Sequence, residues 1–207
     1  MIATAIPRLH LVSDRRLCDL SALPTVIERA VAGGVDAVHL REKDLPAGEL
    51  VEAARALRLA AGDASLFVND RVDVALISGA QGVQLGESGI SVRDARSLIG
   101  DRQLIGRSVH DVEGARRAAE DGADFVIAGH VYETASKAGQ AGRGPQFIAS
   151  IAAVCPVPII AIGGITPEHV AEVMAAGAHG VAVISGILQS NDPARAAERY
   201  AEAVAKG

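Results

Sequence analysis

The chain has 207 residues, 49% hydrophobic and 22% charged, a balance typical of one globular domain with a sizeable core. Aromatic residues make up only 2% and the net charge is −5, which argues against nucleic acid as a partner. Its N-terminus lacks the pattern of a signal peptide, and no apolar run approaches the ~20 residues of a transmembrane helix. The two cysteines, Cys18 and Cys155, match neither a disulfide framework nor a zinc motif. We therefore expect a cytoplasmic protein without a membrane partner.

Short β-branched runs alternate with alanine-rich helical patterns along the chain. Strands are predicted at Arg8–Ser13, Ala37–Arg41, Ser65–Asn69, Gly82–Leu85, Gln103–Ser108, Phe125–Gly129, Pro158–Ile162 and Gly180–Ile184. Helical patterns include Ala47–Ala61, Val92–Ile99, Val112–Asp121, Pro167–Ala176 and Pro193–Lys206. Eight strands, each followed by a helix, predict an α/β fold, a compact (β/α)8 TIM barrel that forms one domain over residues 1–207. The alternative, an open doubly wound sheet, lacks a Gly-x-Gly-x-x-Gly motif after its first strand.

A short repeat marks the places where helices end and strands begin. It recurs at residues 32–38, 78–83, 121–126 and 176–181, with a glycine before each strand. Glycine suits the left-handed position just past a helix, so this repeat predicts structure rather than catalysis.

Polar side chains follow the second to fifth predicted strands. In a barrel, the carboxyl ends of the strands carry the working residues. Asp70 can act there or cap the next helix, and His110 has the same two interpretations. Basic groups at this end suit an anionic substrate. The predicted substrate contacts are His39, Arg41, Lys43, Asn69, Gln84 and Ser108.

The sixth predicted strand delivers His130 to a polar, glycine-rich loop. This loop runs to Gly144, carries Lys137 and Arg143, and is the longest connection of the chain. Imidazole is well suited to moving protons near neutral pH, and long loops often cover substrates. We therefore predict His130 as the catalytic acid–base group, Lys137 as a substrate contact and the loop as a lid.

Small residues follow the last two predicted strands. Gly163 and Gly164 come after the seventh, and Ser185 and Gly186 after the eighth. Backbone N–H groups at these places are a recurrent phosphate site of barrels. The rim shows neither the carboxylate pair of a glycosidase nor a zinc cluster. The residues thus predict a phosphorylated small molecule and proton-transfer chemistry.

Six ordered motifs resemble the thiamine phosphate synthase/thiazole tautomerase superfamily over essentially the whole chain. They are residues 39–43, 68–73, 82–86, 105–110, 162–165 and 180–185.

The resemblance leaves two branches to separate. The synthase branch joins a pyrimidine diphosphate to a thiazole phosphate with magnesium, and its motifs read Gln-Leu-Arg-Glu-Lys and His-Leu-Gly-Gln-x-Asp. Here His39 replaces the glutamine, Gln84 replaces the histidine, and Gly89 replaces the metal-binding aspartate. Asp70, the other expected metal ligand, is present. One carboxylate is a poor site for Mg²⁺.

The tautomerase (TenI) branch is more similar at the sixth strand. Its Gly-His-Val-Phe-Glu-Thr resembles residues 129–134, and a Gly-Arg-Gly recurs at residues 142–144. The resemblance therefore implies a thiazole tautomerase, an isomerase of thiamine biosynthesis. Its substrate is a carboxythiazole phosphate, His130 is its acid–base group, and it needs no metal or cofactor. Barrels of this size often pair, so we expect a homo-oligomer.

Two other functions stay open at this point. One is the Mg²⁺-dependent synthase, and the other is a non-catalytic protein that binds a phosphorylated ligand.

Overall fold

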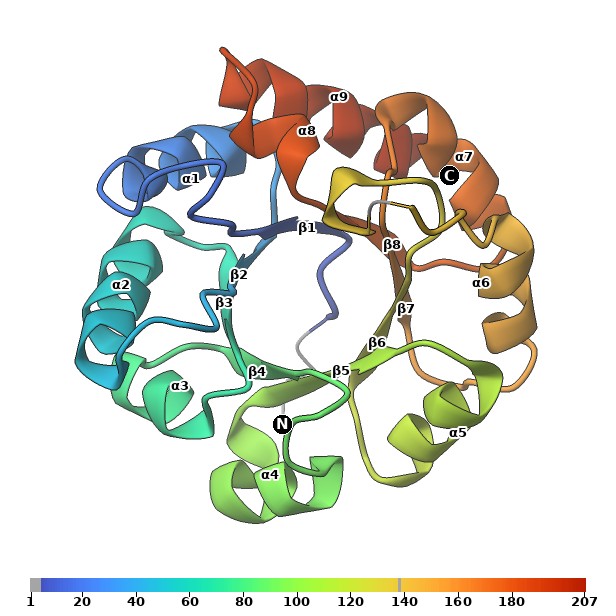
Figure 1. The fold of residues 1–207 in the computed structure, drawn as a ribbon, viewed down its shortest axis with the longest axis horizontal. Helices are drawn as coiled ribbons and strands as arrows, with labels where there is room; N and C mark the ends of the chain where they lie inside the picture. The colour runs from blue at the N-terminus through green and yellow to red at the C-terminus, as the bar shows by residue number, and fades with distance from the viewer. Residues whose placement is uncertain (1–4, 138) are drawn as a thin grey trace.

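The computed structural model describes residues 5–137 and 139–207, and its eight parallel strands close into a barrel (Figure 1). Each strand pairs with the next, and β8 pairs with β1. The predicted barrel is confirmed, and the strand ends differ from the prediction by no more than one residue. The strands are β1 (Leu9–Val12), β2 (Ala37–Leu40), β3 (Ser65–Asn69), β4 (Gly82–Leu85), β5 (Leu104–Val109), β6 (Phe125–Gly129), β7 (Ile159–Ile162) and β8 (Gly180–Val183).

The helices form a ring around the barrel, as Figure 1 shows. None that the structure describes in residues 5–137 and 139–207 is long and apolar enough to cross a bilayer. The α-helices are α1 (Leu23–Ala32), α2 (Ala47–Ala60), α3 (Val72–Ser78), α4 (Val92–Ile99), α5 (Val112–Glu120), α6 (Pro145–Ala152), α7 (Pro167–Ala175), α8 (Ser185–Leu188) and α9 (Pro193–Lys206). Two 3-10 turns are η1 (Gly100–Arg102) and η2 (Ala135–Lys137).

The glycine repeat does what its position predicts. Gly79, which follows α3, has a φ of 68°, and Gly122, which follows α5, has a φ of 93°. These left-handed conformations reverse the chain from helix to strand at little cost for glycine.

Apolar side chains fill both sides of the sheet, because parallel strands in a barrel are covered on both faces. The larger core lies between strands and helices and is rich in leucine, valine and isoleucine. A smaller core fills the barrel itself and consists of Val12, Ala37, Phe67, Phe125, Ile127, Ile160 and Ala182.

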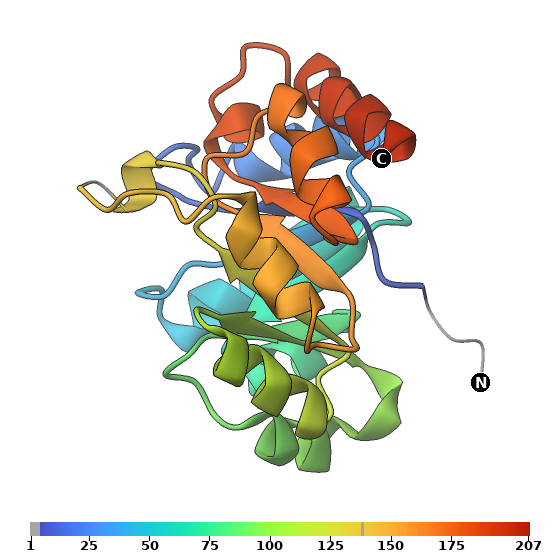
Figure 2. The ribbon, with the colours of Figure 1, turned by 90° about the vertical axis from the view of Figure 1, so that its right-hand side faces the viewer.

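The described residues of the connection between β6 and α6, 130–137 and 139–144, extend beyond one end of the barrel. In Figure 2 they project on one side of the molecule, whereas residues 5–8, which lead into β1, lie on the opposite side. The polar loops of the predicted site therefore share one end.

Two histidines pair inside the barrel. His10 Nε2 lies 2.9 Å from the Pro7 carbonyl oxygen, and His10 Nδ1 lies 2.8 Å from His39 Nε2. Because a carbonyl oxygen only accepts, His10 Nε2 donates to it and His10 Nδ1 accepts from His39 Nε2. Burial lowers the pKa of His10 to about 4 and holds the pKa of His39 well below its ordinary value. Both rings are therefore neutral near pH 7.

This pair predicts a loss of stability in mild acid. The unfolded chain binds protons on these histidines below a pKa of ~6.5, whereas the folded chain resists them until about pH 4. Stability is thus complete above that unfolded pKa and falls as the pH drops through this window. We expect the free energy of unfolding in urea to decrease by about 5 kcal/mol from about pH 7 to about pH 4.5, roughly half of it from each histidine.

The control is the double variant His10→Gln/His39→Gln, which lacks both titrating rings. Its unfolding free energy should vary less over the same pH range than that of the wild type. An equal pH dependence in both proteins would assign the effect to other groups.

Candidate active site

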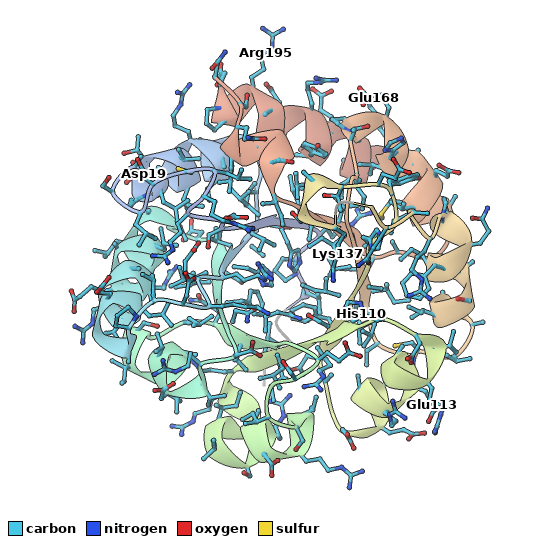
Figure 3. All side chains as sticks on the ribbon, in the orientation of Figure 1. Asp19, His110, Glu113, Lys137, Glu168 and Arg195 are labelled. Atoms are coloured by element: carbon cyan, nitrogen blue, oxygen red, sulfur yellow. The ribbon has the colours of Figure 1, made fainter. Side chains whose placement is uncertain are left out.

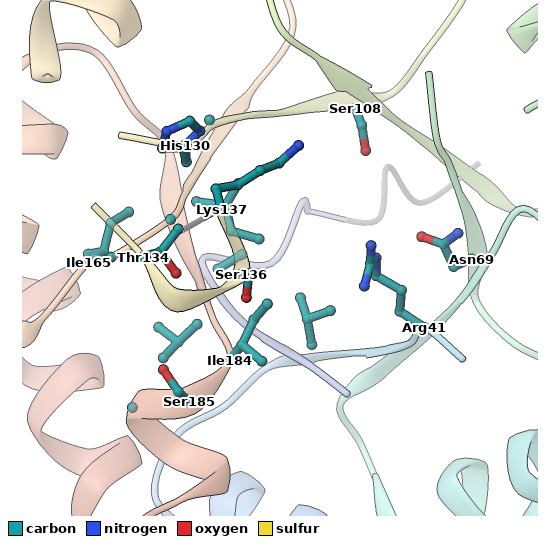
Figure 4. A pocket seen from close by; sticks show the side chains of 18 of the residues that line it. Arg41, Asn69, Ser108, His130, Thr134, Ser136, Lys137, Ile165, Ile184 and Ser185 are labelled. Carbon is teal, nitrogen blue, oxygen red and sulfur yellow. The ribbon is translucent and has the colours of Figure 1, made fainter. Parts of the chain in front are cut away.

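A pocket of about 900 Å³ opens at the carboxyl ends of the strands (Figure 4). This volume lies at the upper end of the range for small-molecule sites. Most of the substrate contacts predicted from the sequence line it, together with the predicted catalytic residue. They are Arg41, Lys43, Asn69, Ser108, His130, Lys137, Gly163, Gly164, Ser185 and Gly186.

Positive charge converges on this pocket. Figure 4 shows Arg41 and Lys137 extending toward its middle from two sides, with Asn69 and Ser108 along one wall. Within residues 5–137 and 139–207, Arg41, Lys43 and Lys137 form no salt bridge. These three cations, unpaired among the described residues, give the pocket a positive charge that suits a multiply charged anion.

The other labelled charges lie elsewhere. In Figure 3, Lys137 and His110 lie over the end of the barrel, whereas Asp19, Glu113 and Glu168 lie toward the outside of the ring. Arg16 also lines the pocket, but its guanidinium binds Asp14 at 2.6 and 2.8 Å. Bidentate pairing offsets the charge of Arg16 and lowers the pKa of Asp14.

His39 and Gln84 lie beneath the pocket rather than in its lining, so the structure does not bring these two predicted contacts to the site. The His39 ring pairs with His10, and Gln84 Nε2 donates to Ser108 Oγ at 3.1 Å. Two acceptors, His39 Nδ1 and Gln84 Oε1, are buried without a hydrogen-bond partner among the described residues. Alternation along a strand predicts the inward face correctly but leaves the depth of each side chain open.

Neither Asp70 nor His110 caps a helix, so that interpretation is wrong for both. Helix α3 has no side-chain cap, and Asp111 caps α5 by accepting from the Gly114 N–H at 2.6 Å. Asp70 has a φ of 59° and accepts from the Gly86 N–H and the Asn69 side chain. His110 Nδ1 donates to the carbonyl of Gly129 at 3.1 Å, since a carbonyl oxygen only accepts. Both residues hold neighbouring loops in place.

His130 lines the pocket and also fastens the loop that follows β6. Its Nε2 lies 3.1 Å from the carbonyl oxygen of Ala141, so Nε2 carries a proton and donates it. The backbone N–H of Arg143 donates back to the His130 carbonyl at 3.3 Å, and Gly144 donates to Val131 at 2.8 Å. The imidazole is therefore part of the scaffold that closes this loop.

The same loop is anchored on α7. The Tyr132 ring stacks on His169 with centroids 4.0 Å apart, and its hydroxyl donates to Glu172 at 2.6 Å. Burial, with the nearby Glu172 carboxylate, raises the pKa of Tyr132 to about 12, so the phenol stays protonated. Thr134 and Ser136 follow in the loop and line the pocket, although sequence reasoning missed them. Both hydroxyl residues lie within three positions of Lys137 in the sequence, and this polar stretch could have identified them as pocket residues.

Gly163 and Gly164 allow this loop to approach β7. Gly163 has a φ of 105°, and a Cβ added there would lie 2.5 Å from the His130 Cβ. Gly164 has a φ of 65°, and an added Cβ would lie 2.3 Å from the Glu133 carbonyl oxygen. These glycines therefore position the segment that leads to Lys137, besides lining the pocket with backbone.

This geometry predicts the cost of a side chain at Gly163. We expect Gly163→Ala to lower the free energy of unfolding by more than about 2 kcal/mol, because it combines left-handed strain with a clash. Gly122→Ala is the matched control, since Gly122 has a φ of 93° and open space around its Cβ position. Its loss should be about 1 kcal/mol in the same urea titration. Equal losses of unfolding free energy in the two variants would show that the close approach of the loop to Gly163 adds no cost beyond the backbone strain.

Comparisons with known proteins point to one family. A family model described as thiamine monophosphate synthase matches residues 9–187. A putative thiamine-phosphate synthase of Geobacter sulfurreducens is 47% identical over 190 residues, covering 89% of this chain and 88% of the relative. A thiamine-phosphate synthase of Moorella thermoacetica is 43% identical over 185 residues, covering 87% and 88%.

Solved structures agree with the sequence comparisons. A thiamine phosphate pyrophosphorylase from Pyrococcus furiosus superimposes with a TM-score of 0.86 at 34% identity, covering 96% of both chains. A 3-hexulose-6-phosphate synthase reaches a TM-score of 0.78 at 20% identity, a likeness of fold alone.

These comparisons overturn the predicted isomerase. The relatives are synthases, which are transferases, so the assignment to thiazole tautomerase is wrong. That assignment depended on residues 129–134 and 142–144 and on the departures from the synthase motifs at His39, Gln84 and Gly89, together a small part of the chain. The structure gives both segments a shared role, because His130 and Val131 hold the loop through Ala141, Arg143 and Gly144.

Proposed function

The chain belongs to the thiamine monophosphate synthase family, and from this premise we propose that it is a thiamine-phosphate synthase. Such a synthase is a transferase of thiamine biosynthesis. The family resemblance implies that it joins a pyrimidine diphosphate to a thiazole phosphate. Its expected cytoplasmic location and self-association stay predictions.

The observation that carries this proposal is that one pocket holds two regions suited to phosphate. Arg41, Lys43 and Lys137 form a cationic region. Backbone at residues 163–164 and 185–186 forms a second region, and Figure 4 shows Ser185 across the pocket from Asn69. A single monophosphate needs one such region, whereas a diphosphate and a monophosphate together need two.

The same residues suit the reaction. When the bond between the pyrimidine methylene carbon and the diphosphate oxygen breaks, the electron pair leaves with the diphosphate. Lys137 and Arg41 would stabilise the charge that develops there. The thiazole nitrogen then forms the new carbon–nitrogen bond with its lone pair. Val12, Ile162 and Ile184 give the pocket apolar walls for the two rings.

The magnesium ion that the synthase resemblance implies does not fit the donor set of this chain. No group of three or more His, Cys, Asp or Glu side chains comes together in residues 5–137 and 139–207. Asp70 already accepts hydrogen bonds at both carboxylate oxygens, and Gly89 replaces the second acidic ligand. We therefore derive no step through a metal ion.

The proposal predicts that the protein forms thiamine phosphate and releases pyrophosphate from the two substrates. Lys137→Ala should lower kcat/KM by ~10²–10³-fold, because it removes a cation that stabilises the leaving group. Lys206→Ala is the matched control. Lys206 is exposed at the end of α9, and among the described residues its ion-pair partner is Glu202 at 3.9 Å, so its removal should leave the rate unchanged.

The measurement is chromatographic detection of thiamine phosphate together with a pyrophosphate assay. It is run both with Mg²⁺ and with EDTA. No product from the wild type in either condition would refute the synthase assignment. Binding of both substrates without turnover would instead indicate a ligand-binding protein.

A further inference from the structure

The Asp70 side chain fills the turn between β4 and α4. Its Oδ1 accepts from the Gly86 N–H at 2.6 Å, and its Oδ2 accepts from Asn69 Nδ2 at 2.7 Å. The turn itself closes through the Gly89 N–H, which donates to the Gly86 carbonyl at 3.0 Å. Asp70 therefore ties the end of β3 to the loop after β4 and orients Asn69, which lines the pocket.

A side chain at position 89 would compete with Asp70 for the same space. A Cβ added at Gly89 would lie 2.5 Å from Asp70 Oδ1, closer than real Cβ contacts. A Cβ added at Gly86 would lie 3.1 Å from Asp70 Oδ2. The position of the Asp70 carboxylate therefore depends most on Gly89, where a Cβ would force it to move, and less on Gly86, where a shift of a few tenths of an ångström would make room.

Negative charge is scarce in the pocket lining. Asp70 is not among the residues that line the pocket, and Glu87 is the only described carboxylate that is. Glu87 Oε2 lies 3.6 Å from His110 Nε2, on the side of β5. A magnesium ion needs near-octahedral oxygen ligands, usually one or two carboxylates with phosphates and water. The lining offers it one carboxylate, which lies beside a histidine.

Positive charge, in contrast, is plentiful in the same lining. Arg41, Lys43 and Lys137 line the pocket without a salt-bridge partner in residues 5–137 and 139–207. Arg41 and Lys137 extend toward the same space in Figure 4. Arginine and lysine bind phosphate oxygens directly and offset their charge without a metal.

We propose that this chain binds the diphosphate of its substrate with Arg41, Lys43 and Lys137, with little help from a divalent cation. Asp70 then serves as a positioning residue that fixes Asn69 and the turn at Gly86. This inference rests on the proposed function for the identity of the ligand, but it concerns how the ligand's charge is offset.

The first test is calorimetric binding of inorganic pyrophosphate to the full chain, in EDTA and in excess Mg²⁺. We expect the two dissociation constants to agree within about threefold, and Lys137→Ala to weaken both by about tenfold or more. Binding that requires Mg²⁺ would overturn the inference and leave the synthase proposal standing. Absence of pyrophosphate binding in both conditions would also overturn the inference. Failure of the synthase proposal is distinguished by the product assay, in which the wild type would then form no thiamine phosphate.

The second test compares Gly89→Asp with Gly89→Ala. Both variants displace Asp70, but only aspartate adds a carboxylate beside it. We expect the Asp variant to bind pyrophosphate about tenfold more weakly than the Ala variant in EDTA, and Mg²⁺ to restore its affinity. Equal Mg²⁺ dependence in the Asp variant, the Ala variant and the wild type would contradict the inference.

The third test separates positioning from ligation at Asp70. Asp70→Asn keeps an oxygen that accepts from the Gly86 N–H, and its Nδ2 can donate to Asn69 Oδ1 once the Asn69 amide turns over, whereas Asp70→Ala keeps neither contact. We expect the Asn variant to retain pyrophosphate affinity in EDTA within about threefold, and the Ala variant to lose about tenfold. Equal losses in EDTA, or a loss seen only with Mg²⁺, would refute the positioning role.

Discussion

The site depends on how closely the loop after β6 can approach the end of β7. Two glycines with positive φ leave room for the backbone of His130 and Glu133, where any side chain would collide. The Tyr132 ring then stacks on α7, and the loop returns to hydrogen-bond the residues that began it. Lys137 reaches the pocket because this path is fixed at both ends. The loop after β6 and the backbone region suited to phosphate therefore depend on the same two glycines.

Much of the fold could be predicted because barrel strands are buried on both faces and read as continuous apolar runs. The inward face of β2 was also predictable from alternation, which places His39 and Arg41 on one side. The depth of each residue was not. Two residues along a strand span about 6.6 Å, enough to put Arg41 in the pocket and His39 in the core beneath it. Contacts between loops, such as Asp70 with Gly86, leave no periodic signal in the sequence.

The failure of the tautomerase prediction has a physical basis. A histidine at the end of a barrel strand has the right chemistry for proton transfer, but its residue type does not reveal its partner. In the structure, one nitrogen of His130 is committed to a backbone carbonyl of its own loop. Local motifs report such loop geometry as readily as they report catalysis. The similarity to synthases extends over most of the chain and includes the ends of all eight strands, so it is stronger evidence than the two local motifs.

The histidine pair inside the barrel has a consequence for how its two positions vary together. Its hydrogen bonds run in one direction only, from His39 to His10 and from His10 to the carbonyl of Pro7. Replacing one ring leaves the other with a donor or an acceptor that the surrounding phenylalanines cannot satisfy. The energetic effects of substitution at positions 10 and 39 are therefore expected to be strongly non-additive.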